Sequence, residues 1–191
     1  LAGRYRQDHE EMIKAYFSKM KGGAKSPPGV GLSEVLWSWF GAVTGVGTCG
    51  YLSARFFEPR DLTLLIGSFG ASAVLVYAAI KSPLAQPRNL VGGHILAGLI
   101  GVTCYKFFGD TLWIAGALAA SLAIVVMLLT KTLHPPAGAT ALIAVIGGDK
   151  IHALGFLYAL VPAGLGAMVL LGVALLVNNL SRHRRYPEYW F

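Results

Sequence analysis

Charged side chains are scarce in this sequence of 191 residues. Only 13% of the residues are Asp, Glu, Lys or Arg, against roughly 25% in an ordinary soluble domain. Cysteine is rarer still. Cys49 and Cys104 both lie inside apolar runs, so no disulfide framework is expected. Together with 55% hydrophobic residues, these scarcities exclude a disordered chain, a nucleic-acid-binding module and a secreted disulfide scaffold.

The basic residues are distributed as in the loops of a membrane protein. The net charge is +7, and the 16 Lys and Arg lie almost entirely between or outside the apolar runs. We therefore interpret the charge as a topology signal, and we expect a lipid bilayer and no nucleic acid as partner. Acidic residues are missing from every apolar run after the first. This absence argues against a cation pump or a carboxylate proton relay.

Six apolar runs are the candidate membrane segments. They cover residues 34–57, 62–80, 89–108, 112–130, 135–148 and 154–178. The fifth is too short to cross alone, because a spanning helix needs about 20 residues. If all six cross, the side with both termini holds 12 Lys and Arg and the other side 4. If the second and fifth runs are re-entrant, the split becomes 10 to 6. Basic residues concentrate in the cytoplasm, so six crossings with both termini cytoplasmic are favoured.

An internal repeat relates the two halves of the chain. Residues 70–75 (GASAVL) resemble residues 138–143 (GATALI) at an offset of 68, and each copy lies in the second of three runs. An odd number of spans per repeat inverts the second copy, as in many secondary transporters. We therefore predict an all-α integral membrane protein with six transmembrane segments in a 3+3 inverted repeat. Its domain would cover residues 34–178, between an N-terminal part, 1–33, and a basic cytoplasmic tail, 179–191.

The segments before the two repeat copies look non-helical. Residues 62–68 are strand-like, and Pro135 and Pro136 suit only the first turn of a helix. We predict extended chain followed by half-helices that begin near Gly70 and Gly138, with their N-termini facing each other near the bilayer midplane. The N-terminal part differs, because apolar residues at helical spacing predict an amphipathic helix. This helix would lie on the cytoplasmic membrane surface or pack on the cytoplasmic loops.

Helix N-termini with small residues can bind an anion, because their N–H groups carry partial positive charge and glycine allows close approach. The predicted substrate-binding residues are Gly70, Ala71, Ser72, His134, Pro135, Pro136, Gly138, Ala139 and Thr140. A second set, nearer the cytoplasmic access, is Arg88, Asn89 and His94. In the alternative interpretation, the small residues only let helices pack closely, and Arg88 only anchors its loop.

Other chemistry receives little support. We find no nucleophile motif, phosphate loop or zinc spacing, so no enzyme activity, metal or cofactor is expected. His94 and His134 could approach each other, which leaves a bis-His haem protein as a further alternative. The Gly41-x-x-x-Gly45 pattern offers a small-residue face for contacts within or between subunits, so a homo-oligomer also stays open.

The sequence around His134 resembles a known family. Residues 134–142 (HPPAGATAL) are similar to the motif that names the HPP family of integral membrane proteins. Residues 82–94 (SPLAQPRNLVGGH) and 69–72 (FGAS) resemble further blocks of that family. The resemblance covers roughly residues 33–178.

Members of this family in plastids and cyanobacteria are associated with nitrite transport. The resemblance therefore implies a transporter or channel for nitrite or another small inorganic anion. It also implies a multi-pass protein of the inner cell membrane, or of an organelle envelope in a eukaryote. The family is usually described with four spans, and helices split by extended chain would explain the difference. A membrane scaffold or sensor subunit remains the alternative.

Overall fold

The computed structural model describes residues 2–60 and 62–191, and describes side chains from residue 11 onward. The chain divides into two units, Leu1–Val30 and Gly31–Phe191. The first contains helix α1 (Ala2–Lys19). The apolar side chains Met12, Ile13, Tyr16 and Phe17 of α1 are all more than half exposed, as is Met20 directly after it.

The second unit is a bundle of helices, and the described residues contain no β-strand. Its α-helices are α2 (Leu32–Leu52), α3 (Ser68–Ala73), α4 (Gly93–Phe108), α5 (Leu112–Leu129), α6 (Pro135–Ile146), α7 (Asp149–Leu154) and α8 (Leu165–Leu180). Four are extended by π-helical turns: η1 (Ser53–Phe57) follows α2, η3 (Val74–Ala78) follows α3, η5 (Arg88–Gly92) precedes α4 and η6 (Ala159–Gly164) precedes α8. Two short 3₁₀ turns are η2 (Glu58–Arg60) and η4 (Pro83–Ala85).

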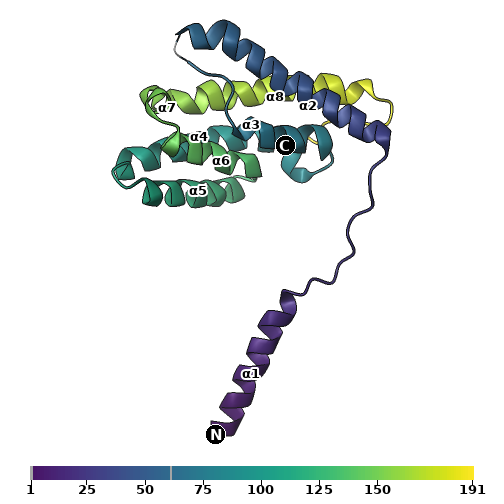
Figure 1. The fold of residues 1–191 in the computed structure, drawn as a ribbon, viewed down its shortest axis with the longest axis vertical. Coiled ribbons are helices and arrows are strands. Elements are labelled where there is room, and N and C mark those ends of the chain that lie inside the picture. Colours follow the sequence, from purple (N-terminus) through teal and green to yellow (C-terminus); the bar gives the residue numbers. More distant parts are fainter. Residues whose placement is uncertain (1, 61) are drawn as a thin grey trace. The chain divides into compact units, whose positions relative to one another are not determined.

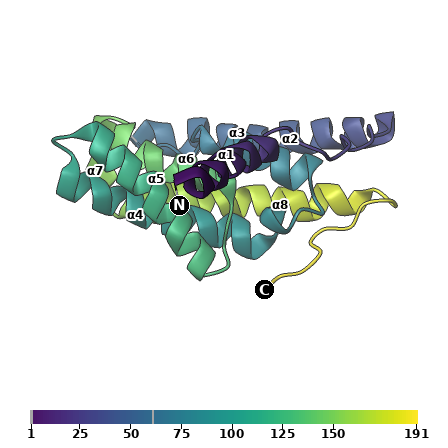
Figure 2. The same ribbon diagram turned by 90° about the horizontal axis from the view of Figure 1, so that it is seen from below.

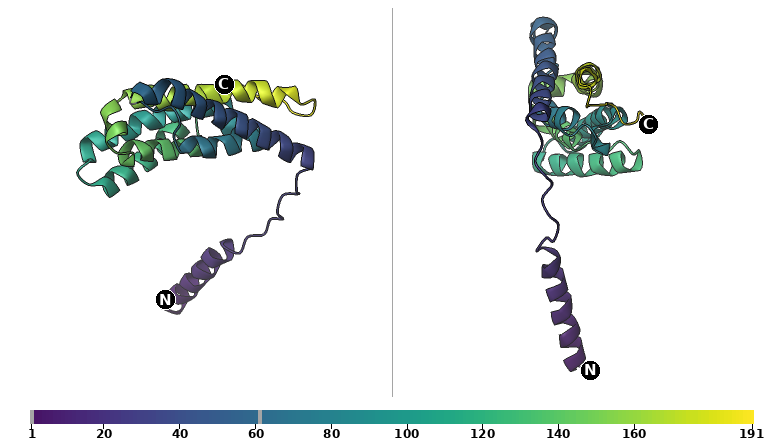
Figure 3. Two further views of the ribbon diagram at one scale, coloured as in Figure 1. Left: turned by 45° about the horizontal axis from the view of Figure 1, so that its top comes forward. Right: turned by 90° about the vertical axis from the view of Figure 1, so that its right-hand side faces the viewer.

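The two short helices α3 and α6 lie in the middle of the bundle. In Figure 1, α2 and α8 lie along one side and α5 along the other, with α3, α4 and α6 between them. Figures 2 and 3 show this bundle from other sides. Small residues allow the central helices to approach closely. A Cβ added at Gly101 of α4, for example, would lie 2.8 Å from Ala144 Cβ of α6.

The predicted half-helices are present. Helix α3 begins at Ser68, and residues 62–66 before it have no regular secondary structure. Helix α6 begins at Pro135, after residues 132–134 without regular structure. Three helical segments are long and apolar enough to cross a membrane, namely Arg88–Phe108, Leu112–Leu129 and Ala159–Leu180. Helix α2 has the length, with 21 residues, but is not apolar enough to be counted with them.

The predicted small-residue face of α2 is used inside the chain. Gly41 and Gly45 both face the ring of Tyr77, which a Cβ at either position would overlap. The Tyr77 hydroxyl donates to Leu170 O of α8 at 3.0 Å. Tyr77 therefore joins α2, the turn after α3 and α8, and it occupies the surface that a second subunit would need on these glycines.

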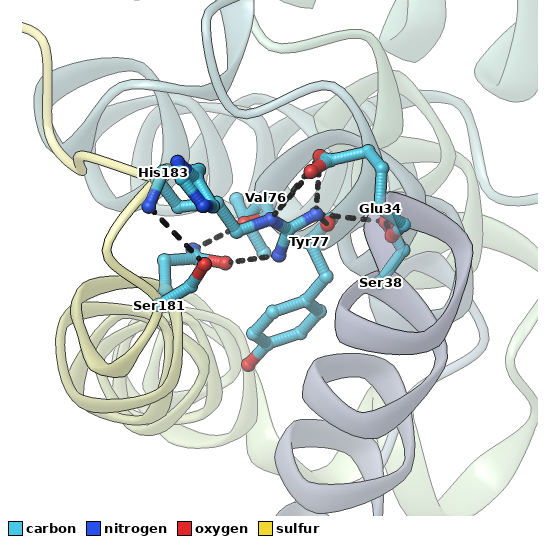
Figure 4. Close-up of polar contacts among 8 residues, drawn as sticks. Glu34, Ser38, Val76, Tyr77, Ser181 and His183 are labelled. Carbon is cyan, nitrogen blue, oxygen red and sulfur yellow. Dashed lines mark hydrogen bonds and ion pairs between the residues drawn. The ribbon is translucent and has the colours of Figure 1, made fainter. Parts of the chain in front are cut away.

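A buried arginine fastens the C-terminal residues to the bundle. Arg184 is 6% exposed and forms an ion pair with Glu34 at the start of α2, with Nη2 2.6 Å from Oε1. It also donates to Ser38 Oγ at 2.8 Å, Tyr77 O at 2.8 Å and Asn178 Oδ1 at 2.9 Å. Figure 4 shows these groups converging around its guanidinium. The residues predicted as a basic tail thus include a cation inside the fold.

The chain beyond Arg184 covers the connection between α3 and α4. The Tyr186 hydroxyl donates to Ala85 O at 2.7 Å, and Glu188 N donates to Gln86 Oε1 at 2.9 Å. Burial raises the pKa of Tyr186, so its hydroxyl keeps the proton that it donates. The C-terminus, the start of α2 and the 81–88 loop consequently gather at one end of the bundle.

Candidate functional site

A cluster of polar side chains is buried where α3, α4 and α6 meet. Ser72, His94, His134 and Thr140 are all 0% exposed, and Ser68 is 2% exposed. Ser68 and Ser72 belong to α3, His94 to α4 and Thr140 to α6, while His134 precedes the first residue of α6. We call these five residues the histidine cluster. Buried polar groups at this depth are costly in a membrane and are typical of functional sites.

A continuous series of hydrogen bonds connects the five side chains. Thr140 Oγ1 donates to Ser68 Oγ at 2.8 Å and lies 2.7 Å from His94 Nδ1. His94 Nε2 lies 2.8 Å from Ser72 Oγ, and His134 Nε2 lies 2.9 Å from the same oxygen. The two imidazole rings have centroids 5.1 Å apart. The Ser72 hydroxyl therefore bridges the two histidines.

The position of His134 follows from the local sequence. Pro135 and Pro136 fix the backbone for the first turn of a helix and stop the helix from extending backwards through His134. His134 itself is extended, with φ −136° and ψ 102°. Its Nδ1 lies 2.8 Å from Leu84 O. A carbonyl oxygen only accepts, so Nδ1 carries a proton and donates it.

Close backbone contacts hold the segment before α6 against α4. A Cβ added at Gly93 would lie 2.8 Å from His134 Cβ and 2.9 Å from Thr132 O, so only glycine fits without a shift. Asn89 Nδ2 donates to Leu133 O at 2.9 Å. These contacts bring His94, one residue after this glycine, to the side of His134.

The cluster is fully hydrogen-bonded in this conformation. Among the described residues, every buried side-chain nitrogen and oxygen has a partner. The backbone around Thr140 is also engaged, because Tyr158 OH donates to Thr140 O at 2.9 Å. A ligand at this point would have to replace hydrogen bonds that the protein makes with itself.

The structure brings together part of the predicted substrate site. Ser72, His134 and Thr140 meet as predicted, and His94, predicted nearer the access, lies at their centre. Pro136 is buried. The other members point away from the cluster or lie at its edge: Gly70, Ala71, Pro135 and Ala139 are exposed and Gly138 is half-buried. Arg88 lies outside the cluster, with Nη2 2.6 Å from Thr130 O.

The backbone donors expected at the two helix starts are already used. Gly70 N donates to Gly67 O at 3.2 Å, and Ala137 N donates to His134 O at 2.8 Å. Pro135 and Pro136 have no N–H to offer. The donors and acceptors that converge are therefore hydroxyls and imidazoles. A ligand at the predicted site would meet these side chains and not the backbone N–H groups that were expected.

The haem alternative does not fit this arrangement. Bis-His ligation needs an iron between the two ring nitrogens and a slot for the porphyrin. Here the Ser72 hydroxyl contacts both Nε2 atoms, and Phe69 packs edge-on against His94 with centroids 5.3 Å apart. Across the described part of the chain, no group of three or more His, Cys, Asp or Glu is placed to hold a metal ion.

Two members of this region were missed by sequence reasoning. Ser68 lies one helical turn before Ser72, and Ser72 Oγ also donates to Ser68 O at 3.2 Å. This i, i+4 spacing becomes informative only if the helix begins at Ser68, and the sequence predicted extended chain up to that residue. Tyr158 had no such signal, because its contact with α6 depends on the turn at residues 155–158 and on tertiary packing.

Comparisons with known proteins place the chain among transmembrane proteins. A family profile described as "HPP, transmembrane region" matches residues 27–187. A transmembrane protein of Dictyostelium discoideum is 45% identical over 179 residues, covering 92% of this chain and 57% of that protein. A second from the same organism is 42% identical over 184 residues, covering 94% of this chain and 64% of that protein. The chain therefore spans less than two thirds of these relatives. No solved structure matches it significantly.

Proposed function

Because the chain belongs to the HPP family of transmembrane proteins, we propose that it is a membrane transporter or channel for a small inorganic anion, with nitrite as the first candidate. We place the path of the anion beside the histidine cluster, between α3 and α6. We expect it in the inner membrane of a cell, or in an organelle envelope in a eukaryote.

The observation that carries this proposal is a pair of broken helices with polar side chains between them. Neither α3 with its π-helical turn nor α6 is long enough to span a bilayer, and each follows non-helical chain. Irregular backbone at membrane depth is tolerated only where protein buries it or where it lines a cavity. Ser72 from one short helix and Thr140 from the other both contact His94. Discontinuous helices with polar residues between them are the usual site of substrate binding in secondary transporters.

Element lengths support six crossings. The extended residues 132–134 add about 10 Å at ~3.3 Å per residue, and the helix that follows adds about 18 Å at ~1.5 Å per residue. Residues 62–67 with the helical turns to Ala78 similarly give about 36 Å. The second sum exceeds the ~30 Å of a hydrocarbon core, and the first, at about 28 Å, comes close to it. Extended chain thus supplies the length that the short helices lack.

The packing of the helices supports the inverted repeat. If α2, α3 and α4 correspond to α5, α6 and α8, each contact in one half needs a counterpart in the other. Helix α2 contacts α8 as α5 contacts α4, and α3 contacts α8 as α6 contacts α4. Helix α2 contacts α3 as α5 contacts α6. The histidines break this symmetry, since the residue 68 positions after His94 is Pro162 and the residue 68 positions before His134 is Ile66.

The histidine cluster offers donors without a permanent charge. An anion in hydrocarbon needs hydrogen-bond partners to offset its desolvation. Hydroxyl and imidazole donors to a charged group contribute about 1.5–3 kcal/mol each, so a few of them hold an anion without trapping it. Because these donors are bonded internally here, binding requires α3 to move away from α6 or the side chains to turn. A Cβ at Gly70 or Gly138 would meet nothing within 4 Å, so neither helix start is blocked by protein atoms.

Nitrite uptake into proteoliposomes tests this function. The protein is reconstituted, and uptake is compared with that of protein-free liposomes, because nitrous acid crosses lipid by itself. Thr140→Val keeps the side-chain shape and removes the hydroxyl that contacts His94, so we expect a several-fold lower initial rate. Thr103→Val is the matched control, since Thr103 is half-buried and bonds only within its own helix, to Leu99 O at 2.8 Å.

The outcomes separate the alternatives. Uptake no faster than in protein-free liposomes, with correctly folded protein, overturns the transport function and favours a scaffold or sensor subunit. Equal rates for the wild type and Thr140→Val keep transport but remove the histidine cluster from the path.

A further inference from the structure

While Thr140 donates to Ser68, two neutral imidazoles do not supply enough protons for all the side-chain contacts of the histidine cluster. Thr140 donates its single hydroxyl proton to Ser68 Oγ. The contact between His94 and Thr140 therefore needs a proton on His94 Nδ1. His134 donates its Nδ1 proton to Leu84 O. Both Nε2 atoms are then bare acceptors, and both face Ser72 Oγ, at 2.8 and 2.9 Å. One hydroxyl proton cannot serve two acceptors.

Adding one proton satisfies every contact between the side chains of the cluster, and only the longer contact of Ser72 Oγ with Ser68 O, at 3.2 Å, is left without a proton. With His134 doubly protonated, His134 Nε2 donates to Ser72, Ser72 donates to His94 Nε2, His94 Nδ1 donates to Thr140, and Thr140 donates to Ser68. The neutral cluster can also be satisfied, but only with the hydroxyls turned. Ser68 then donates to Thr140, Thr140 to His94 Nδ1, His94 Nε2 to Ser72 and Ser72 to His134 Nε2. The same heavy-atom positions therefore support two patterns of hydrogen bonds among these side chains, which differ by one proton and run in opposite directions.

We propose that the histidine cluster is a proton relay between Ser68 and His134, and that it couples movement of the anion to movement of a proton. This inference rests on the proposed anion transport. In one passage, a proton from water binds Ser68 Oγ, and Ser68 passes its own proton to Thr140. Thr140, His94 and Ser72 each receive one proton and pass one on, and His134 ends as an imidazolium. His134 then releases its Nδ1 proton on the Leu84 side. The neutral pattern returns when the hydroxyls turn back and both imidazoles change tautomer, with the proton of His94 moving from Nδ1 to Nε2 and that of His134 from Nε2 to Nδ1.

The charges around the cluster suit this role. Among the elements packed on it, α3 with its π-helical turn, α6 and α8 contain no charged residue, and α4 has only Lys106 near its far end. The connecting loop contributes Lys81 and Arg88, and the turn before α8 contributes Tyr158. No carboxylate on these elements would neutralise a proton held on His134, so a bound anion is the natural partner for that charge. Proton and anion then cross as a neutral pair.

Ser72 is the residue of the relay whose contacts no neighbouring residue makes. Ser72 Oγ is the single atom that contacts both Nε2 atoms in the described structure. Ser72→Ala removes that bridge and leaves both imidazoles in place. Ser121→Ala is the matched control, because Ser121 is an exposed helical serine that donates to Ala117 O at 2.8 Å, four residues earlier.

Coupling is measured on the wild-type protein in proteoliposomes with nitrite as the probe. Internal pH is followed with a trapped dye, and a potassium diffusion potential is set with valinomycin. A coupled 1:1 carrier moves one proton with each nitrite, and its protein-dependent rate does not change when the interior is made positive. A uniporter moves no proton, and the same potential accelerates it several-fold. Protein-free liposomes give the background from nitrous acid.

The results distinguish this inference from the proposed function. Protein-dependent uptake with one proton per nitrite in the wild type, falling well below one in Ser72→Ala and unchanged in Ser121→Ala, supports the relay. Uptake without proton movement overturns the relay and leaves anion transport standing. No protein-dependent uptake overturns both. If Ser72→Ala does not fold, the wild-type ratio still decides whether transport is coupled, and an unchanged ratio in a folded Ser72→Ala overturns the role of the cluster.

Discussion

Replacement of Arg184 by methionine tests how far the C-terminal residues hold the bundle together. The side chain of Arg184 is 1% exposed, while that of Glu34 is 37% exposed. Without the guanidinium, Glu34 can turn to water, and Ser38 keeps its own bond to Glu34 O at 2.8 Å. Tyr77 O and Asn178 Oδ1 are buried and each lose a donor. Two unsatisfied acceptors cost about 1–3 kcal/mol each.

Methionine recovers part of this loss, because its side chain stays apolar and buried. Burial of such a side chain stabilises by about 1.5–3 kcal/mol, and the arginine stem already supplies some of that burial. We therefore expect Arg184→Met to lower the free energy of unfolding by about 2–4 kcal/mol, from the two terms above. This corresponds to a roughly 30- to 900-fold change in the unfolding equilibrium constant.

Glu34→Ala should cost at least as much, although it removes the more exposed partner. It leaves the Arg184 cation buried without a counter-charge, and breaking a buried pair in this way costs about 3–5 kcal/mol. The double variant, Glu34→Ala with Arg184→Met, should be more stable than Glu34→Ala alone, because the unpaired charge is then gone.

The assay is equilibrium unfolding in mixed detergent micelles, with Arg185→Met as the matched control at an exposed arginine one residue away. Limited proteolysis gives a second measure, since Arg184→Met should release the C-terminal residues faster. An Arg184→Met variant as stable as the control would refute the reasoning. A double variant less stable than Glu34→Ala would refute the argument from the unpaired charge.

Further predictions concern packing, topology and the N-terminal unit. Gly101→Ala should lower stability by about 1–3 kcal/mol through overpacking, because the new methyl would overlap Ala141 of α6; thermal unfolding measures this, and an unchanged midpoint contradicts it. Lys81→Cys and Arg182→Cys, both exposed, should react with an impermeant thiol reagent from the same side of the membrane, and labelling from opposite sides contradicts six crossings. A peptide of residues 2–21 should gain helical circular dichroism on anionic vesicles, whereas a spectrum unchanged by vesicles favours packing on the cytoplasmic loops.

Local signals made the two half-helices predictable. Pro135 and Pro136 set the start of α6 whatever surrounds them, and the strand-like residues 62–66 before α3 have no regular secondary structure. The start of α3 at Ser68 lies two residues before the predicted Gly70. Such offsets are common at helix ends, where the first turn depends on local hydrogen bonds.

The histidine cluster was only partly predictable, because it depends on tertiary packing. The repeat identified Ser72 and Thr140, and the family motif identified His134. Nothing in the spacing indicates that His94 contacts both short helices, since this requires the close approach at Gly93. The internal position of Arg184 could not be predicted for a related reason. In the sequence it is one of several basic residues near the C-terminus, and only the positions of Glu34 and Tyr77 make it an internal residue.

The contact between Arg184 and the first turns of α2 has a consequence for biosynthesis. Arg184 is made 150 residues after Glu34, its partner in this ion pair. While the later helices are inserted, α2 has neither that cation nor α8 beside it. Tyr77 can already lie against Gly41 and Gly45, but its hydroxyl has no acceptor until Leu170 arrives. Closure of the bundle therefore has to wait until the segment with α8 and Arg184 has been made.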